Sequence, residues 1–254
     1  MSSRRFCCAF GAALAVWCLA TGLANAGPWP RPPGEHFNRS EFEMFASRHG
    51  EQQFRQLVVR DYAEFGLGEA LTIGGQLAAV TQEAQGPGYL ERGTGTAEAE
   101  MFAILHQRRR GGRASGLRVT GGLGTAKFAR GQRIIGQDSY LGVAYLHGVG
   151  SDRAFAILDA GVRASLGDDA DQLRLGGRLG VKHRGAMVIL ESFNTVAISG
   201  PSGTGVDFDL GQISLSAVLP LRDALQVEIG GRIDTFTRNI GRGQSVFVAM
   251  WWTV

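Results

Sequence analysis

The chain has 254 residues, with 26 lysines and arginines against 23 aspartates and glutamates, so its net charge is +3. A balance this close to neutral gives no argument for nucleic-acid binding, although the sequence pI is about 9.0. The 38 glycines follow no collagen period, which excludes a fibrous chain. The length allows one large domain or two small ones.

Residues 1–26 have the layout of a secretory signal peptide. Arg4 and Arg5 give a positive start, residues 6–19 an apolar core, and Ala24-Asn25-Ala26 a cleavage site of small residues. A transmembrane anchor is the alternative, but the apolar run is short and ends at the cleavage site. We therefore expect cleavage before Gly27 and export of the rest of the chain.

The cysteines support an exported protein that does without disulfides. All three, Cys7, Cys8 and Cys18, lie in the expected signal peptide, so the mature chain has none. It therefore uses neither disulfides nor thiolate metal sites. Loss of the two signal-peptide arginines also leaves the mature chain a net charge of +1.

The proline-rich residues 27–34, "GPWPRPPG", predict an extended periplasmic lead-in rather than a helix. Residues 35–254 then alternate between apolar and polar positions in segments of about ten residues, which is typical of β-strands. Twelve strands are predicted: 35–47, 54–65, 70–82, 96–108, 114–124, 137–148, 154–165, 172–182, 186–197, 207–219, 225–237 and 244–254.

The connections between these segments differ in a regular way. Every second one belongs to a set that holds all the long loops (48–53, 83–95, 125–136, 166–171, 198–206 and 238–243), whereas the interleaved connections are short. An up-and-down meander with two such rims is typical of an outer-membrane barrel with short periplasmic turns and longer extracellular loops. We therefore predict an all-β fold: an up-and-down antiparallel transmembrane β-barrel of about 12 strands, with both chain termini on the periplasmic rim.

The alternation within each strand supports this prediction. In 154–165, Ala156, Leu158 and Val162 share one parity while Asp159 and Arg163 share the other. Hydrocarbon offers no hydrogen-bond partner, so a spanning sheet must close, with one face toward lipid and the other toward the lumen. In 54–65 Asp61 shares the parity of Leu57, which predicts a bulge or a position at the rim.

The last strand, "SVFVAMWWTV", resembles the C-terminal signal that barrel-assembly machinery recognises, although Val254 replaces the usual terminal aromatic residue. Trp251 and Trp252 are expected near the periplasmic interface, where amphipathic rings are favoured. The alternative fold is a soluble β-sandwich or barrel. It would carry large residues on the inward parity, and here that parity is rich in charge, glycine and serine.

Several segments resemble a known group of proteins. The opening "GPWPRPPGE", together with "YAEFGLGEALTIG", "AILDAGVR", "ADQLRLGGRLG" and "ESFNT", is similar to uncharacterised proteobacterial outer-membrane barrels, the transporter- or porin-like barrels linked to phenol-degradation pathways. The resemblance covers most of the mature chain. It implies an outer-membrane location and passage of small organic solutes, and it supplies no catalytic residues.

The lumen parity gathers the charged residues on which function would depend. Two arrangements are open: a basic wall facing an acidic wall across a narrow pore, or a network of ion pairs that plugs the barrel. The candidate lumen-lining residues are Arg118, Asp159, Arg163, Arg174, Arg178, Glu191, Glu228, Arg232 and Asp234.

Other candidate sites are weaker. Asp168, Asp169 and Asp171 in "LGDDADQ" match no defined calcium loop, so we expect solvated acids on an outer loop. "GTGT" and "SGPSGTG" do not lie between a strand and a helix, as a phosphate-binding loop requires, and are expected to be flexible outer loops. Among the histidines only His49 is placed clearly on the outer rim, and no recognisable hydrolase signature accompanies it.

The sequence therefore predicts a passive outer-membrane channel for small solutes, with no enzymatic activity, cofactor or metal. Its expected partners are outer-membrane lipid, the barrel-assembly machinery and an unidentified small solute, but no nucleic acid. A closed structural or adhesion barrel is the first alternative, and a lipid-modifying enzyme is the second.

Overall fold

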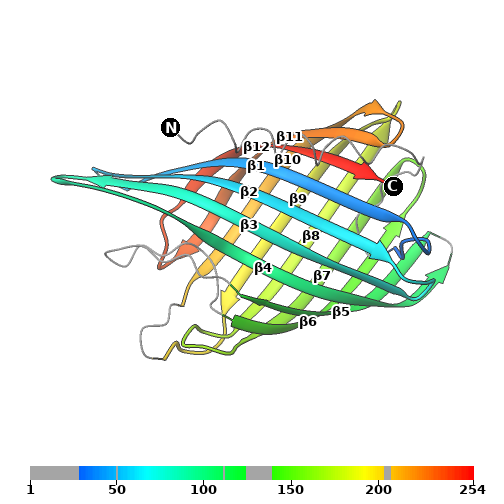
Figure 1. Ribbon diagram of the computed structural model, residues 1–254, viewed down its shortest axis with the longest axis horizontal. Helices are drawn as coiled ribbons and strands as arrows, with labels where there is room; N and C mark the ends of the chain where they lie inside the picture. The colour runs from blue at the N-terminus through cyan, green and yellow to red at the C-terminus, as the bar shows by residue number, and fades with distance from the viewer. Residues whose placement is uncertain (1–28, 50, 111, 124–138, 203–206) are drawn as a thin grey trace, which may run out of the picture.

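The computed structural model describes residues 29–254 except 50, 111, 124–138 and 203–206 (Figure 1). The described residues form no helix. They form twelve strands: β1 (His36–His49), β2 (Gln52–Gly66), β3 (Leu71–Gly86), β4 (Tyr89–Arg110), β5 (Arg113–Leu123), β6 (Ser139–Gly150), β7 (Ala154–Ser165), β8 (Gln172–His183), β9 (Ala186–Ala197), β10 (Asp209–Arg222), β11 (Leu225–Arg238) and β12 (Gly243–Thr253). The predicted signal peptide lies outside the described residues.

Each strand pairs antiparallel with the next, and β1 pairs with β12 to close the barrel. The closing seam runs from Phe37 opposite Thr253 to Ser47 opposite Gly243. Beyond it the backbones of His36 and Val254 exchange two hydrogen bonds, of 2.8 and 2.9 Å. No strand edge is left open along this seam, as a spanning sheet requires. The predicted up-and-down barrel of twelve strands is confirmed.

The two rims differ in the lengths of their connections. Connections of two to four residues follow β2, β4, β6, β8 and β10, and we call the rim that they form the short-turn rim. The start of β1 at His36 and the C-terminal Val254 lie there as well. The opposite, long-loop rim carries the six residues between β7 and β8 and the eleven between β9 and β10, although its connections after β1 and β3 have two residues each and the one after β11 has four. The short-turn rim is the one that the sequence predicts to be periplasmic.

The loop predicted over 83–95 is wrong, because β3 and β4 continue through it as a hairpin. Their pairing runs out to Gly86 opposite Tyr89, and "GTGT" lies within β4. Pro87 and Gly88 form the turn, in which the positive φ of Gly88 (76°) suits a glycine. At this end β1 to β4 reach beyond the other strands (Figure 1). The stretch is rich in glycine, which is typical of turns, so its composition did not indicate a strand.

The outer surface of the barrel is apolar. Leu158 and Val162 of β7 are 58% and 43% exposed, whereas the side chains of Asp159 and Arg163, which follow them in the chain, point inward and form ion pairs. In β10, Ile213, Leu215 and Leu219 are likewise exposed. Because water would not cover such a surface favourably, the exterior fits a lipid environment.

Asp61 of β2 is the exception on this surface. It is exposed on the lipid parity, where Ser40 of β1 hydrogen bonds to it from the directly opposite position. The pairing of β2 with β1 and with β3 passes this point without a register shift. The predicted bulge is therefore wrong. The hydroxyl of Ser40 supplies the carboxylate with a partner on a face that otherwise has none.

Many strand glycines make room for aromatic rings on the neighbouring strand. A Cβ on Gly180 would lie 2.2 Å from the ring of Phe155, its register partner on β7. The same relation joins Gly74 to Phe102, Gly122 to Tyr140 and Gly230 to Phe247, with separations of 2.4 to 2.5 Å. These rings lie along the inner wall, because the glycine beside each provides the space.

The lipid-facing surface gives a first testable prediction. Leu158→Arg should lower the free energy of unfolding by about 2–4 kcal/mol, because it places a charge near the middle of the hydrocarbon layer. The matched control is Leu221→Arg, which is 57% exposed near the end of β10 and should cost only about 0–1 kcal/mol. Urea titration of protein folded in liposomes measures both losses, and equal losses would contradict this placement of the lipid layer.

Candidate functional site

The centre of the barrel holds a cavity of about 890 Å³. Side chains from most of the strands line it, and both charged and apolar groups contribute. All nine candidate residues lie on its wall: Arg118, Asp159, Arg163, Arg174, Arg178, Glu191, Glu228, Arg232 and Asp234. Alternation brings them together, because the inward parity of each strand faces the same axis.

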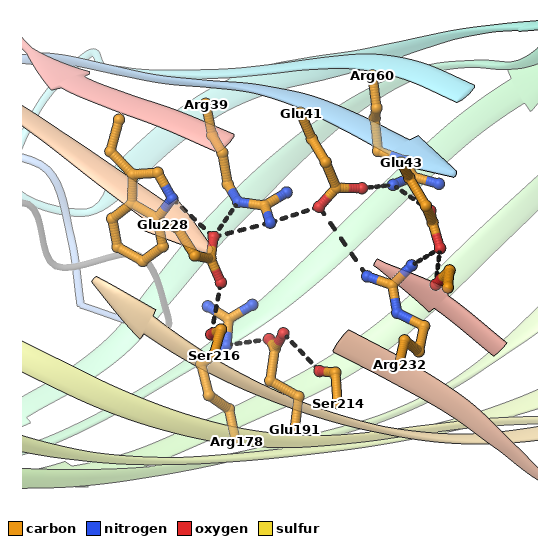
Figure 2. Close-up of polar contacts among 12 residues, drawn as sticks. Arg39, Glu41, Glu43, Arg60, Arg178, Glu191, Ser214, Ser216, Glu228 and Arg232 are labelled. Carbon is orange, nitrogen blue, oxygen red and sulfur yellow. Dashed lines mark hydrogen bonds and ion pairs between the residues drawn. The ribbon is translucent and has the colours of Figure 1, made fainter. Parts of the chain in front are cut away.

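Glu228 of β11 is the centre of the most buried polar cluster (Figure 2). Its side chain is 1% exposed. One carboxylate oxygen accepts hydrogen bonds from Arg39 at 2.8 and 3.0 Å and from the indole of Trp251 at 2.9 Å. The other accepts from Ser216 at 2.7 Å. A buried carboxylate is stable only with such partners, and here three strands besides its own supply them.

The cluster continues along β1. Arg39 also pairs with Glu41, which is fully buried and accepts a further hydrogen bond from Arg60 of β2. Glu43 accepts from Arg232 at 2.7 Å and from Ser245 at 2.6 Å. Figure 2 shows acidic and basic side chains alternating along this chain of contacts. The alternation offsets the cost of burying each charge.

On the opposite side of Figure 2, Arg178 of β8 donates to Glu191 of β9, which also accepts a hydrogen bond from Ser214 at 3.3 Å. Asp234 lies farther along β11. It accepts hydrogen bonds from Gln212 at 2.8 Å and from the backbone nitrogen of Gly243 at 2.7 Å. Asp234 therefore has no arginine partner among these contacts and joins β10, β11 and β12 instead.

A second cluster lies on the wall formed by β4 to β7. Arg163 of β7 pairs with Glu98 at 2.9 Å and Glu100 at 2.5 Å. The hydroxyl of Tyr140 lies 2.7 Å from both carboxylates, and its ring lies under the Arg163 guanidinium, 4.0 Å from the centroid. Arg118 pairs with Asp159 at 3.2 Å.

These contacts bear on the two arrangements that the sequence left open. Arg118, Arg163, Arg178 and Arg232 each pair with an acid on their own or a nearby strand, so the charges do not separate into a basic and an acidic wall. Of the two arrangements, the network of ion pairs is the one that lines the lumen. It does not fill the lumen, because the paired side chains still line the central cavity.

Toward the short-turn rim the lumen becomes apolar. Phe37, Ile189, Val218 and Trp251 come from four strands and form one buried cluster, with exposures of 0 to 4%. A second cluster joins Phe102, Ile104 and Leu146, and the ring of Tyr62 packs against both. We call these residues together the apolar floor. Trp251 was expected at the membrane interface, but its ring points into the barrel.

The N-terminal segment, Trp29–Glu35, lies across the short-turn mouth. Arg31 is 2% exposed and pairs with Glu64 of β2 at 2.7 Å. Its guanidinium also lies over the ring of Phe37, 4.5 Å from the centroid. The ring of Trp29 meets Phe155 of β7 edge-on at 6.4 Å. Because β7 lies half-way round the ring from β1, the segment reaches from one side of the mouth to the other.

Gly66 at the end of β2 permits this path. A Cβ there would lie 2.2 Å from the carbonyl oxygen of Pro32, so the segment passes directly against it. Backbone hydrogen bonds from Gly34 to Gly66 (2.9 Å) and from Gly66 to Glu35 (3.0 Å) hold the two stretches together. The proline-rich residues described here are thus docked onto the barrel.

Sequence reasoning did not find the apolar floor or the docked segment. A signal for the floor was present, because its large residues share the inward parity at the ends of strands nearest the short-turn rim. The position of Arg31 had no such signal, since a residue outside the strands has no parity.

The acidic loop and the histidines are placed as follows. Asp169 is buried at 8% exposure and lines the cavity, so the expectation of a solvated residue is wrong there. Asp171 accepts a hydrogen bond from the backbone nitrogen of Ser165 at 2.9 Å and so ties the two ends of the loop. No group of three potential metal ligands occurs among the described residues. His49 ends β1, and its side chain lies outside the described part.

At the long-loop rim, Arg238 at the end of β11 donates hydrogen bonds to Asp207, which lies before β10, at 2.6 Å and to Asp209, the first residue of β10, at 2.7 Å. The bond from Arg238 lowers the pKa of Asp207 below its ordinary value. These pairs fix the entry to β10 against the end of β11.

No protein-family model and no curated protein sequence matches the chain. Solved structures with the same fold do. An outer membrane channel from Pseudomonas putida F1 aligns with a TM-score of 0.64 at 12% identity, over 92% of this chain and all of the other. The NanC porin aligns at 0.55 and 4% identity, over 84% and 98% of the two chains. The translocator domain of the autotransporter NalP from Neisseria meningitidis aligns at 0.53 and 10% identity, over 87% and 89%.

At these identities the likeness establishes the fold. The closed barrel, the apolar exterior and the charged interior agree with it, because a barrel of this kind is stable only where lipid surrounds it. The chain has the fold of the outer-membrane β-barrels, and its apolar exterior fits the lipid surroundings that the sequence predicts.

The buried cluster gives a second prediction. Glu228→Leu should lower the free energy of unfolding by about 3–5 kcal/mol, because it deprives buried Arg39 of a partner and leaves the Trp251 indole without its acceptor. Glu69→Leu, on the exposed turn after β2, is the matched control and should change stability by less than about 0.5 kcal/mol. Urea titration followed by tryptophan fluorescence measures both, and a Glu228 variant as stable as the control would refute the role of the cluster.

Proposed function

We propose that this protein is a passive channel that carries small solutes across the outer membrane through a narrow charged lumen. The observation that carries the proposal is the central cavity. Paired charges line about 890 Å³ of space without filling it, and hydrated polar walls are what a water-filled path requires. Two proteins with the same fold, the outer membrane channel from Pseudomonas putida F1 and the NanC porin, support this proposal.

We infer that the path is narrowest at the short-turn mouth, where the apolar floor and the N-terminal segment meet. Arg31 is the main polar attachment of the segment there, through its buried pair with Glu64. Movement of the segment would widen the mouth without disturbing the barrel, because the closing seam begins only after it. We propose that the segment limits the flux of solutes.

A closed barrel with a structural or adhesive role is the second candidate. The packing of the apolar floor favours it, since the floor is as buried as the core of a soluble protein. Enzymatic activity is not proposed. Recognition of the last strand by the assembly machinery and the connection to phenol degradation stay predictions from the sequence.

Conductance of the purified protein in planar lipid bilayers tests the channel. The wild-type protein should give small, discrete steps because the lumen is narrow. Folded protein that inserts but gives no steps would refute the channel and favour the closed barrel. The shift in gel mobility between boiled and unboiled samples shows that the barrel is folded.

Arg31→Ala tests the role of the segment. The substitution removes the buried ion pair with Glu64, so larger or longer openings than in the wild type are expected in the same bilayers. Arg153→Ala is the matched control, because Arg153 is an exposed arginine in the turn before β7 on the same rim. Openings that are equal in Arg31→Ala and wild type would show that the segment does not limit the path.

A further inference from the structure

Arg174 of β8 differs from the other arginines that line the cavity. Six of them (Arg39, Arg60, Arg118, Arg163, Arg178 and Arg232) form ion pairs with acids of the barrel. Arg174 forms no ion pair or hydrogen bond with another described residue; its contact is with the ring of Phe193 on β9, 4.5 Å from the guanidinium carbon to the centroid. A guanidinium that stacks on a ring through its face keeps the N–H groups on its edge available.

The nearest acids are already engaged. Glu98 and Glu100 lie within electrostatic range of Arg174, but both accept hydrogen bonds from Arg163 and Tyr140. Across the strand pair with β7, Arg174 faces Gly161, which has no side chain to offer. Among the described arginines that line the cavity, Arg174 therefore has guanidinium N–H groups that can bind an anion in the cavity.

The wall beside Arg174 also carries large apolar groups. Phe193 lines the cavity together with Leu210 of β10 and Phe208, the residue directly before β10. Leu210 pairs in register with Thr195, and Thr195 in turn lies opposite Arg174. A cation and a hydrophobic wall thus adjoin within one cavity. A ligand that satisfies both carries an anionic head and an apolar body.

We propose that Arg174 and Phe193 form a binding site for organic monocarboxylates with an aromatic body. The carboxylate accepts two parallel hydrogen bonds from the guanidinium edge, which is the geometry that arginine favours with planar anions. The aromatic body lies along Phe193 and Leu210. The inference rests on the proposed channel and specifies its substrate class.

Isothermal titration of the folded wild-type protein in detergent with benzoate tests the site, with benzamide as the neutral probe of the same shape. Benzoate should bind about tenfold or more tightly than benzamide, because only the carboxylate accepts the charged pair of hydrogen bonds. Equal affinity for the two would overturn the proposal.

The variants sharpen the test. Arg174→Gln should weaken the binding of benzoate about tenfold, to the affinity for benzamide. Arg153→Gln, which removes a distant exposed arginine, should leave the affinity for benzoate unchanged. Arg174→Lys keeps the charge but not the fork of N–H groups, so its affinity for benzoate should fall between those of the wild type and Arg174→Gln. Wild-type affinity for benzoate in Arg174→Lys would refute the two-bond geometry. Phe193→Ala should weaken both probes. The gel-mobility shift confirms that each variant is folded.

The bilayer assay separates this inference from the channel itself. Discrete conductance steps without any preference for benzoate would overturn the carboxylate site and leave the channel standing. Benzoate binding that Arg174→Gln abolishes, in a protein that gives no conductance, would support the site and overturn the channel.

Discussion

Closure of the sheet is the constraint on which the rest of this protein depends. A bilayer core gives the backbone no hydrogen-bond partner, so the first strand must meet the last. The seam between β1 and β12 satisfies that requirement, and it also places Phe37, Arg39, Glu41 and Trp251 side by side. The most buried polar cluster and the apolar floor both meet at this seam, so the lumen is organised around the place where the chain closes on itself.

Closure leaves an interior that behaves in two ways along its length. Near the middle, most charged side chains tolerate the enclosure because they find partners of opposite sign, whereas Arg174 stacks on a ring and Asp234 accepts hydrogen bonds from neutral groups. Near the short-turn rim the walls bring together large apolar groups, which exclude water by contact. Hydrophobic packing thus restricts one end of the lumen, while ion pairing keeps the other part polar.

Much of this was accessible from the sequence. Alternation alone gave the strand number, the order and the inward parity, because side chains on a strand must point to opposite faces. It therefore placed residues such as Arg118 and Glu191 on the lumen wall. It did not reveal how they pair, since pairing depends on register between strands. It also failed at 83–95, where glycines hid a hairpin, and at Arg31, which lies outside any strand and is held by tertiary contacts alone.

The glycines beside the aromatic rings have a further consequence. Phe155 lies along the wall because Gly180 on the next strand leaves it a recess, and a larger residue at 180 would tilt that ring into the bore. The width of the lumen thus depends on pairs of residues on neighbouring strands, a glycine on one and an aromatic residue on the other. In the proposed channel, the exchange of one such small residue would change which molecules fit, without altering any group that touches them.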